Sequence, residues 1–199
     1  MYKIVATLLF TITKLLRKLK TVDKHQIPEN ESYIVTCNHE SMVEIIMLAM
    51  SLYPAEIHYM AKHELFKNKL LDRFFKSVNA FPVNRQNPGP STLKIPVKLL
   101  KEGKIVGIFP SGHRHSDAPM KKGAATIAVL SKKKIVPAAY TGPLKFRDVL
   151  FGKQKCTIKF GQPINTNTYL DQYNKNDAIE QITLKLESET KALIQSMRT

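Results

Sequence analysis

The alternation of apolar and polar positions along the chain predicts short strands separated by helices. Apolar, β-branched runs bounded by turn-forming residues predict strands at residues 32–37, 56–60, 80–83, 104–109, 135–140 and 156–160. Apolar residues at helical spacing predict helices from about Ser41 to before Pro54 and at residues 65–76, 93–101, 123–130 and 177–197. This alternation indicates an α/β fold with a mainly parallel sheet flanked by helices.

The first twenty residues form a distinct segment, with five basic and no acidic residues. Their uncharged run, from Ile4 to Thr13, is shorter than the roughly 20 apolar residues of a spanning helix, and no signal-peptide cleavage site follows it. One side of a helix here carries Ile4, Leu8, Thr11, Ile12, Leu15 and Leu19. We expect residues 1–20 to form an amphipathic helix on a membrane surface, or else an ordinary helix packed on the core. Residues 21–199 are expected to form one domain.

The charge balance indicates a preference for anionic partners. Thirty-one Lys and Arg against sixteen Asp and Glu give a net charge of +15, which favours nucleic acid, an anionic membrane or an acidic protein. The chain has no helix-turn-helix, zinc-finger or RNA-binding aromatic motif and no Trp, so nucleic acid is not expected. The two cysteines are far apart and unpatterned, which is typical of a reducing, cytoplasmic setting.

Three polar clusters follow predicted strands, at residues 38–44, 81–85 and 109–114. In open α/β sheets, ligands bind outside the carboxyl ends of the strands, so the three clusters are expected to meet in one pocket.

His39 and Glu44 are the candidate base and its partner in the first cluster. Histidine is suited to general-base catalysis near neutral pH, and a carboxylate can fix its tautomer. Five residues of helix would separate the two by about 140° around the axis, so they meet only if His39 precedes the helix. The alternative is a capping box, in which Glu44 accepts a hydrogen bond from the Ser41 backbone at the start of the helix.

The second and third clusters offer a phosphate site. Arg85 and Arg114 can each bind phosphate through paired N–H donors. Ser111, Gly112 and His113 precede Arg114 in the same turn, where a hydroxyl and an accessible amide favour an anion. The spacing of His39, Glu44 and the other histidines matches no common zinc pattern, so no metal is expected. Cys37, inside a predicted strand, is expected to be a buried apolar residue.

In their order along the chain, these blocks resemble those of the lysophosphatidic acid acyltransferase family, the 1-acyl-sn-glycerol-3-phosphate acyltransferases of the bacterial PlsC type. His39 and Glu44 resemble its His-x4-Asp block, with Glu in place of Asp. Further blocks are matched by residues 60–66, 81–85, 109–114, 122–125 and 135–139. Arg85, Gly112 and Arg114 agree with the family, whereas Ser111 and His113 replace its Glu and Thr.

The resemblance implies a glycerolipid acyltransferase that needs no cofactor. His39 would deprotonate the sn-2 hydroxyl of lysophosphatidic acid, which attacks the thioester of acyl carrier protein or acyl-coenzyme A to give phosphatidic acid. The expected location is the cytoplasmic face of the cell membrane, as a peripheral or monotopic protein. Ser111 and His113 leave another acceptor open, glycerol 3-phosphate or a different lysophospholipid. A non-catalytic basic protein that binds membranes or nucleic acid is the alternative from another class.

Overall fold

The computed structural model describes residues 2–84, 90–110, 120 and 122–198. Within these residues the chain forms a seven-stranded sheet in the order β1-β7-β6-β2-β5-β3-β4. The strands are β1 (Leu19–Val22), β2 (Ile34–Thr36), β3 (Ile57–Lys62), β4 (Ala80–Val83), β5 (Ile105–Ile108), β6 (Ile135–Thr141) and β7 (Cys156–Phe160). Neighbouring strands are parallel except for the antiparallel pair β6 and β7, so the predicted α/β fold with a mainly parallel sheet is confirmed.

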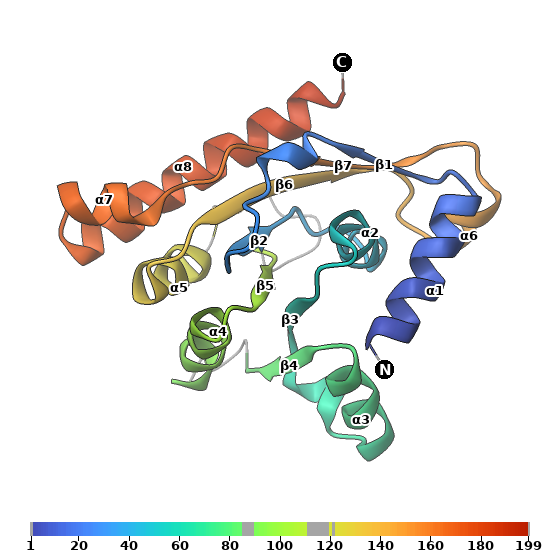
Figure 1. The fold of residues 1–199 in the computed structure, drawn as a ribbon, viewed down its shortest axis with the longest axis horizontal. Coiled ribbons are helices and arrows are strands. Elements are labelled where there is room, and N and C mark those ends of the chain that lie inside the picture. The colour runs from blue at the N-terminus through green and yellow to red at the C-terminus, as the bar shows by residue number, and fades with distance from the viewer. Residues whose placement is uncertain (1, 85–89, 111–119, 121, 199) are drawn as a thin grey trace.

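Helices cover both faces of the sheet, because a parallel sheet is apolar on both sides. They are α1 (Tyr2–Leu15), α2 (Val43–Leu52), α3 (Lys69–Ser77), α4 (Ser91–Lys101), α5 (Gly123–Ser131), α6 (Phe146–Phe151), α7 (Thr166–Gln172) and α8 (Lys175–Ser196). Figure 1 shows α4 and α5 on one side of the central strands and α1 and α2 on the other. The side chains of β2 alternate accordingly, with Ile34 in the core beneath α4, α5 and α8 and Val35 in the core beneath α1 and α2.

The N-terminal helix is shorter than the sequence predicts. The Lys18 backbone N–H bonds to the Thr13 carbonyl and that of Arg17 to Lys14, and Arg17 has a left-handed φ of 50°. This pattern is a Schellman motif, which ends α1 at Leu15. Leu19, expected on the helix, instead begins β1 and pairs with Cys156 of β7. The expectation of a helix reaching residue 20 was therefore wrong.

A second difference concerns residues 65–76, predicted as one helix. The chain forms a short 3-10 helix, η2 (His63–Phe66), and then α3. Asn68 separates them, because its backbone is extended and its side chain accepts hydrogen bonds from the N–H groups of Leu70 and Leu71. An asparagine with this geometry starts a new helix.

Among the described residues, no helix combines the length and the apolar character that crossing a membrane requires.

Candidate active site

The loops that carry the predicted functional residues leave the sheet at its carboxyl edge. The strands β2, β5, β3 and β4 are parallel and lie side by side in this order. Residues 38–44 follow β2, residue 84 follows β4, and residues 109–110 follow β5. The strands leading to the three clusters therefore end on the same side of the sheet, as expected. The predicted phosphate-binding residues Arg85, Ser111, Gly112, His113 and Arg114 lie outside the described residues.

His39 and Glu44 are in direct contact. His39 Nδ1 lies 2.7 Å from Glu44 Oε1, and their side chains are 9% and 0% exposed. The contact forms because α2 begins only at Val43, which leaves His39 in the lead-in loop and Glu44 in the first turn. A carboxylate only accepts hydrogen bonds, so Nδ1 carries the proton and Nε2 presents its lone pair.

Glu44 also accepts hydrogen bonds from the start of its own helix. Its Oε1 atom accepts from the backbone nitrogens of Glu40, at 3.0 Å, and Ser41, at 2.8 Å, and its Oε2 accepts from the Ser41 hydroxyl. Burial alone would raise the pKa of Glu44, but the hydrogen bonds from His39 and Ser41 outweigh it and lower the pKa below the ordinary 4.5. Glu44 is therefore held as a carboxylate beside the imidazole.

Two aromatic rings pack in a row beside His39. The Phe109 ring, just beyond β5, lies 4.8 Å from the His39 ring, and Tyr59 of β3 stacks on Phe109 at 6.1 Å. The Tyr59 hydroxyl donates to the Ile45 carbonyl of α2 at 3.0 Å. A Cβ atom on Gly107 would lie 2.5 Å from Cε1 of Tyr59, so only glycine leaves room for this ring. These contacts fix the imidazole in position.

Asn38 ties the same loop to the neighbouring strand. Its side-chain oxygen accepts from the Tyr140 backbone nitrogen at 2.7 Å, and its Nδ2 donates to the Tyr140 carbonyl at 3.2 Å. The sequence places Asn38 next to His39 but gives it no role, and it assigns none to Tyr59. The sequence carries only a slight signal for either residue. Asn38 is an amide that follows a buried strand, and Tyr59 is an aromatic residue on β3, two strands from β2 in the sheet.

Cys37 is buried, as the sequence predicts, with 1% of its surface exposed. Burial raises the pKa of its thiol far above the usual range, with the nearby Glu44 carboxylate adding to the effect. A thiol held protonated in this way is a poor nucleophile.

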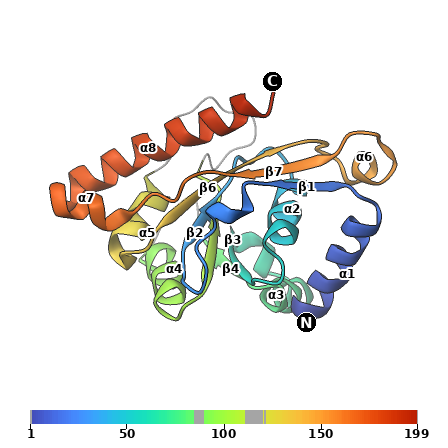
Figure 2. The same ribbon diagram turned by 45° about the horizontal axis from the view of Figure 1, so that its top comes forward.

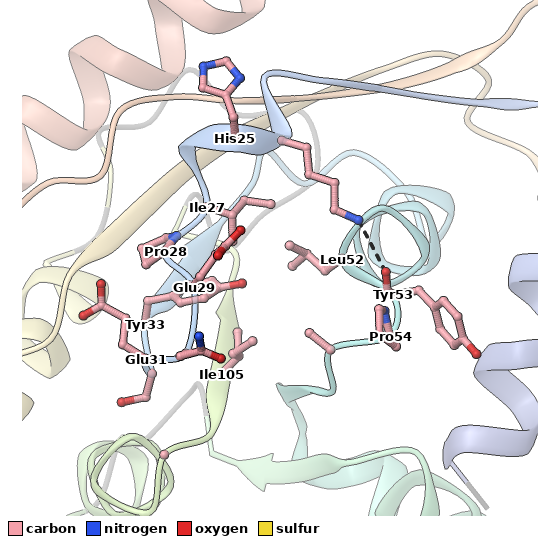
Figure 3. A pocket seen from close by; sticks show the side chains of 15 residues that line it. His25, Ile27, Pro28, Glu29, Glu31, Tyr33, Leu52, Tyr53, Pro54 and Ile105 are labelled. Carbon is pink, nitrogen blue, oxygen red and sulfur yellow. Dashed lines mark hydrogen bonds between the residues drawn. The ribbon is translucent and has the colours of Figure 1, made fainter.

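A separate hollow of about 990 Å³ lies at the amino edge of the sheet, away from His39. Its walls are the segments that enter β2, β3 and β5, including Tyr33, Pro54 and Ile105 (Figure 3). There Lys24 Nζ donates to the Tyr53 carbonyl at 3.4 Å. This hollow lies at the opposite strand ends from the candidate site.

Residues 18–141, which include the His39 site, match the model of the acyltransferase family. A 1-acyl-sn-glycerol-3-phosphate acyltransferase from Bacillus subtilis (strain 168) is 48% identical over 166 residues, 83% of each chain. The chain belongs to the acyltransferase family. The resemblance recognised in its sequence blocks is thereby confirmed.

Further comparisons agree with this membership. A 1-acyl-sn-glycerol-3-phosphate acyltransferase from Streptococcus pneumoniae is 34% identical to this family member, over 83% of this chain and 61% of the other. The crystal structure of PlsC from Thermotoga maritima, a 1-acyl-sn-glycerophosphate (LPA) acyltransferase, superposes with a TM-score of 0.71 at 19% identity, covering 98% of this chain and 80% of that one. At this low identity the likeness shows that the acyltransferase fold is shared.

Proposed function

We propose that this acyltransferase esterifies the sn-2 hydroxyl of 1-acyl-glycerol 3-phosphate and so forms phosphatidic acid. The observation that carries the proposal is the buried His39–Glu44 pair, with Nδ1 engaged and Nε2 available to a substrate. The relative from Bacillus subtilis, whose name states this activity, matches over most of the chain.

The chemistry needs only a base and a positioned acceptor. Nε2 of His39 takes the hydroxyl proton as the acceptor oxygen attacks the thioester carbonyl, and the thiolate then leaves and takes a proton back from the imidazolium. The Glu44 carboxylate balances the imidazolium charge that forms in between. Arg85 and Arg114 hold the acceptor phosphate together with Ser111, Gly112 and His113. A fixed distance from phosphate to base selects the hydroxyl that reacts.

The enzyme works at an anionic membrane surface in this proposal, at the cytoplasmic face of the cell membrane. The side of α1 predicted to be apolar is the side turned away from the protein, with Ile4, Leu8 and Leu15 exposed at 73%, 61% and 80%. The other side packs on the protein through Ala6, which is buried, and Phe10, which stacks on Tyr53 at 4.5 Å. Such an exposed apolar stripe with basic residues at its end favours insertion between headgroups.

Helix α3 enlarges this apolar surface. None of its residues is buried, and Leu70 is 77% exposed. An apolar cavity of about 160 Å³ separates α1, α2 and α3, and its wall includes Phe74 of α3 and also Tyr59, the ring that stacks on Phe109. The exposed helices thus adjoin the residues that hold His39, which suits a substrate drawn from the membrane.

The acyl donor is a thioester of acyl carrier protein or coenzyme A in this proposal. Both donors are acidic, and the net charge of +15 on this chain complements either.

A transfer assay tests the function directly. Purified protein is given a donor labelled in its acyl chain, either acyl-(acyl carrier protein) or acyl-coenzyme A, together with lysophosphatidic acid, glycerol 3-phosphate or another lysophospholipid. The products are separated by thin-layer chromatography. We expect labelled phosphatidic acid from lysophosphatidic acid. The His39→Ala variant should lose roughly 10²–10⁴-fold in rate, the usual contribution of a general base. Labelled product from a different acceptor alone would reject the assigned substrate, and no product with any acceptor would reject acyl transfer.

A further inference from the structure

A third cavity, of about 420 Å³, lies at the C-terminal end of α1, and its wall is rich in cations. Its wall includes five basic side chains and no carboxylate: Lys14, Arg17, Lys20, Lys24 and Lys155. Its apolar wall residues are Phe10, Leu19 and Met50. Like charges that line one cavity repel one another, and an anion bound there would offset this repulsion.

The protein supplies no such anion among its described residues. None of the five cations has a carboxylate within 4.0 Å in that part of the chain. The neighbouring acid, Asp23, lies 4.0 Å from Lys159 instead. The contact found for Lys24 is the Tyr53 carbonyl, at 3.4 Å. The cavity therefore suits a ligand that brings its own negative charge, and phosphate is the common anion that Lys and Arg bind together.

Exposed apolar side chains lie on the same two chain segments as Lys14 and Lys155 of the cavity wall. Leu15, next to Lys14, is 80% exposed, and Phe151 of α6 is 83% exposed. The Lys18 ammonium donates to the Gly152 carbonyl, which joins the end of α1 to the end of α6. Figures 1 and 2 both place α6 beside the C-terminal end of α1. A ligand with both a phosphate and acyl chains matches these basic and apolar side chains better than a free phosphate does.

The cavity reaches from the start of β1, at Leu19, to the last turn of α2, at Met50 and Ser51. Leu19 at the start of β1 pairs with Cys156 at the start of β7, and Thr157 pairs with Thr141 at the carboxyl end of β6. Tyr140, one residue earlier, is the strand residue that Asn38 binds. The Leu19 end of the cavity thus lies toward the strand ends that carry the catalytic loop, and its Met50 and Ser51 end lies toward the opposite strand ends.

We propose that this cavity holds the phosphate of an anionic phospholipid of the bilayer, with the lipid's acyl chains against Leu15 and Phe151. This lipid is a docking ligand, separate from the acceptor and the donor at His39. The inference rests on the proposed membrane docking, which it deepens by naming the headgroup chemistry and the residues that select it.

The test replaces three cations that do not belong to α1, so that the helix itself stays intact. The variant Lys20→Gln, Lys24→Gln, Lys155→Gln is compared with the control Lys94→Gln, Lys101→Gln, Lys104→Gln, which removes the same charge from α4 and the loop after it, remote from α1 (Figure 1). Co-sedimentation with phosphatidylcholine vesicles containing phosphatidylglycerol gives the affinity. We expect a loss on the order of 100-fold for the cavity variant, because each of the three basic residues near an anionic surface contributes about fivefold. The control should lose less than about threefold.

Three results would overturn the proposal. Equal losses in both variants mean that binding follows overall charge. A cavity variant that keeps its vesicle affinity but loses inorganic phosphate binding, seen by ³¹P line broadening, means a free-phosphate site. A variant that keeps vesicle affinity but binds acyl carrier protein less tightly means a protein partner. Vesicle binding needs no turnover, so each of these results stands apart from a failure of the transfer assay.

Discussion

Oε1 of Glu44 lies 2.7 Å from Nδ1 of His39 and 2.8 Å from the backbone nitrogen of Ser41. One carboxylate oxygen thus accepts a hydrogen bond from the candidate base and another from the start of α2. Glu44 therefore caps α2 and orients His39 at the same time. The hydrogen bond from the Ser41 backbone holds the Glu44 carboxylate within reach of the imidazole ring. Separating the two roles therefore requires variants that remove one and keep the other.

Glu44→Gln and Ser41→Ala make this separation. Glu44→Gln keeps an oxygen acceptor but loses the charge that balances the imidazolium, so we expect turnover to fall by at least about 100-fold. Ser41→Ala removes the hydroxyl bonded to Oε2 but leaves the His39 contact, so activity should stay within about fivefold while stability falls by roughly 1–2 kcal/mol. Glu44→Asp shortens the reach and should retain partial activity. Turnover and melting temperature are measured on the same preparations, and a fully active Glu44→Gln enzyme would show that Glu44 is a cap only.

The lowered pKa of Glu44 predicts how stability changes with pH. A carboxyl whose pKa is depressed by folding stabilises the protein above the unfolded pKa, near 4.5, and this contribution disappears as pH falls through the folded pKa. Wild-type protein should therefore exceed Glu44→Gln in unfolding free energy at pH 7, and the difference should shrink below about pH 4.5. Urea unfolding of both proteins, at pH 7 and again below about pH 4.5, measures this difference in unfolding free energy. A difference that is constant or grows on acidification contradicts the assignment.

Much of the sheet could be predicted because its strands are continuous apolar runs. Residues 80–83 and 156–160 were predicted as strands with the bounds that the structure shows. β1 was missed because Leu19–Val22 is short, lies in a basic stretch and pairs with a strand more than 130 residues away. α6 and α7 were missed because they are too short to show a clear helical period.

The candidate site was predictable in its residues but not in its geometry. The spacing of His39 and Glu44 allowed contact only if His39 preceded the helix, and nothing local fixes that start as late as Val43. The stacking of Tyr59 on Phe109 joins two strands of the folded sheet, so no sequence period reveals it. Long-range packing decides such contacts, whereas motif order identifies the residue types.

Gly107→Ala tests whether the aromatic row positions His39. The added methyl would meet the Tyr59 ring at 2.5 Å, so Tyr59 and with it Phe109 must shift, at a cost of roughly 1–3 kcal/mol. We expect kcat to fall about tenfold or more with little change in KM for the acceptor. Gly123→Ala is the matched control, because a Cβ there meets no atom within 4 Å. Restored kcat in Gly107→Ala combined with Tyr59→Leu would support displacement of the ring, and a wild-type kcat in Gly107→Ala would exclude it.

Arg85→Ala and Arg114→Ala test the phosphate assignment, which rests on the sequence blocks. Loss of a charged hydrogen bond to phosphate typically costs about 1.5–3 kcal/mol, or on the order of 10–100-fold in kcat/KM for lysophosphatidic acid. Arg198→Ala, at the exposed C-terminal end, is the control and should behave as wild type. Kinetics at varied acceptor concentration decide the question. An unchanged dependence on lysophosphatidic acid in both variants would remove these arginines from the acceptor site.

The exposed side of α1 gives the last prediction, which concerns membrane docking by apolar insertion. Leu8→Ser with Leu15→Ser removes two side chains that are 61% and 80% exposed, so the fold loses little while a bilayer loses both apolar groups. Burying an apolar side chain of this size contributes about 1.5–3 kcal/mol, so vesicle affinity should fall by more than about tenfold even if each leucine inserts only in part. Leu130→Ser with Leu184→Ser is the matched control. Leu130 lies on α5 and is 47% exposed, and Leu184 lies on α8 and is 55% exposed. Deleting residues 1–20 would be a poorer test, because it removes Leu19 and Lys20 from β1 and uncovers the core beneath Ala6. Salt should weaken binding by wild type and by both variants, because the basic residues remain. If the Leu8→Ser, Leu15→Ser variant and the control variant both bind vesicles as tightly as wild type, α1 is a structural helix. The protein then reaches its lipid substrate by another surface.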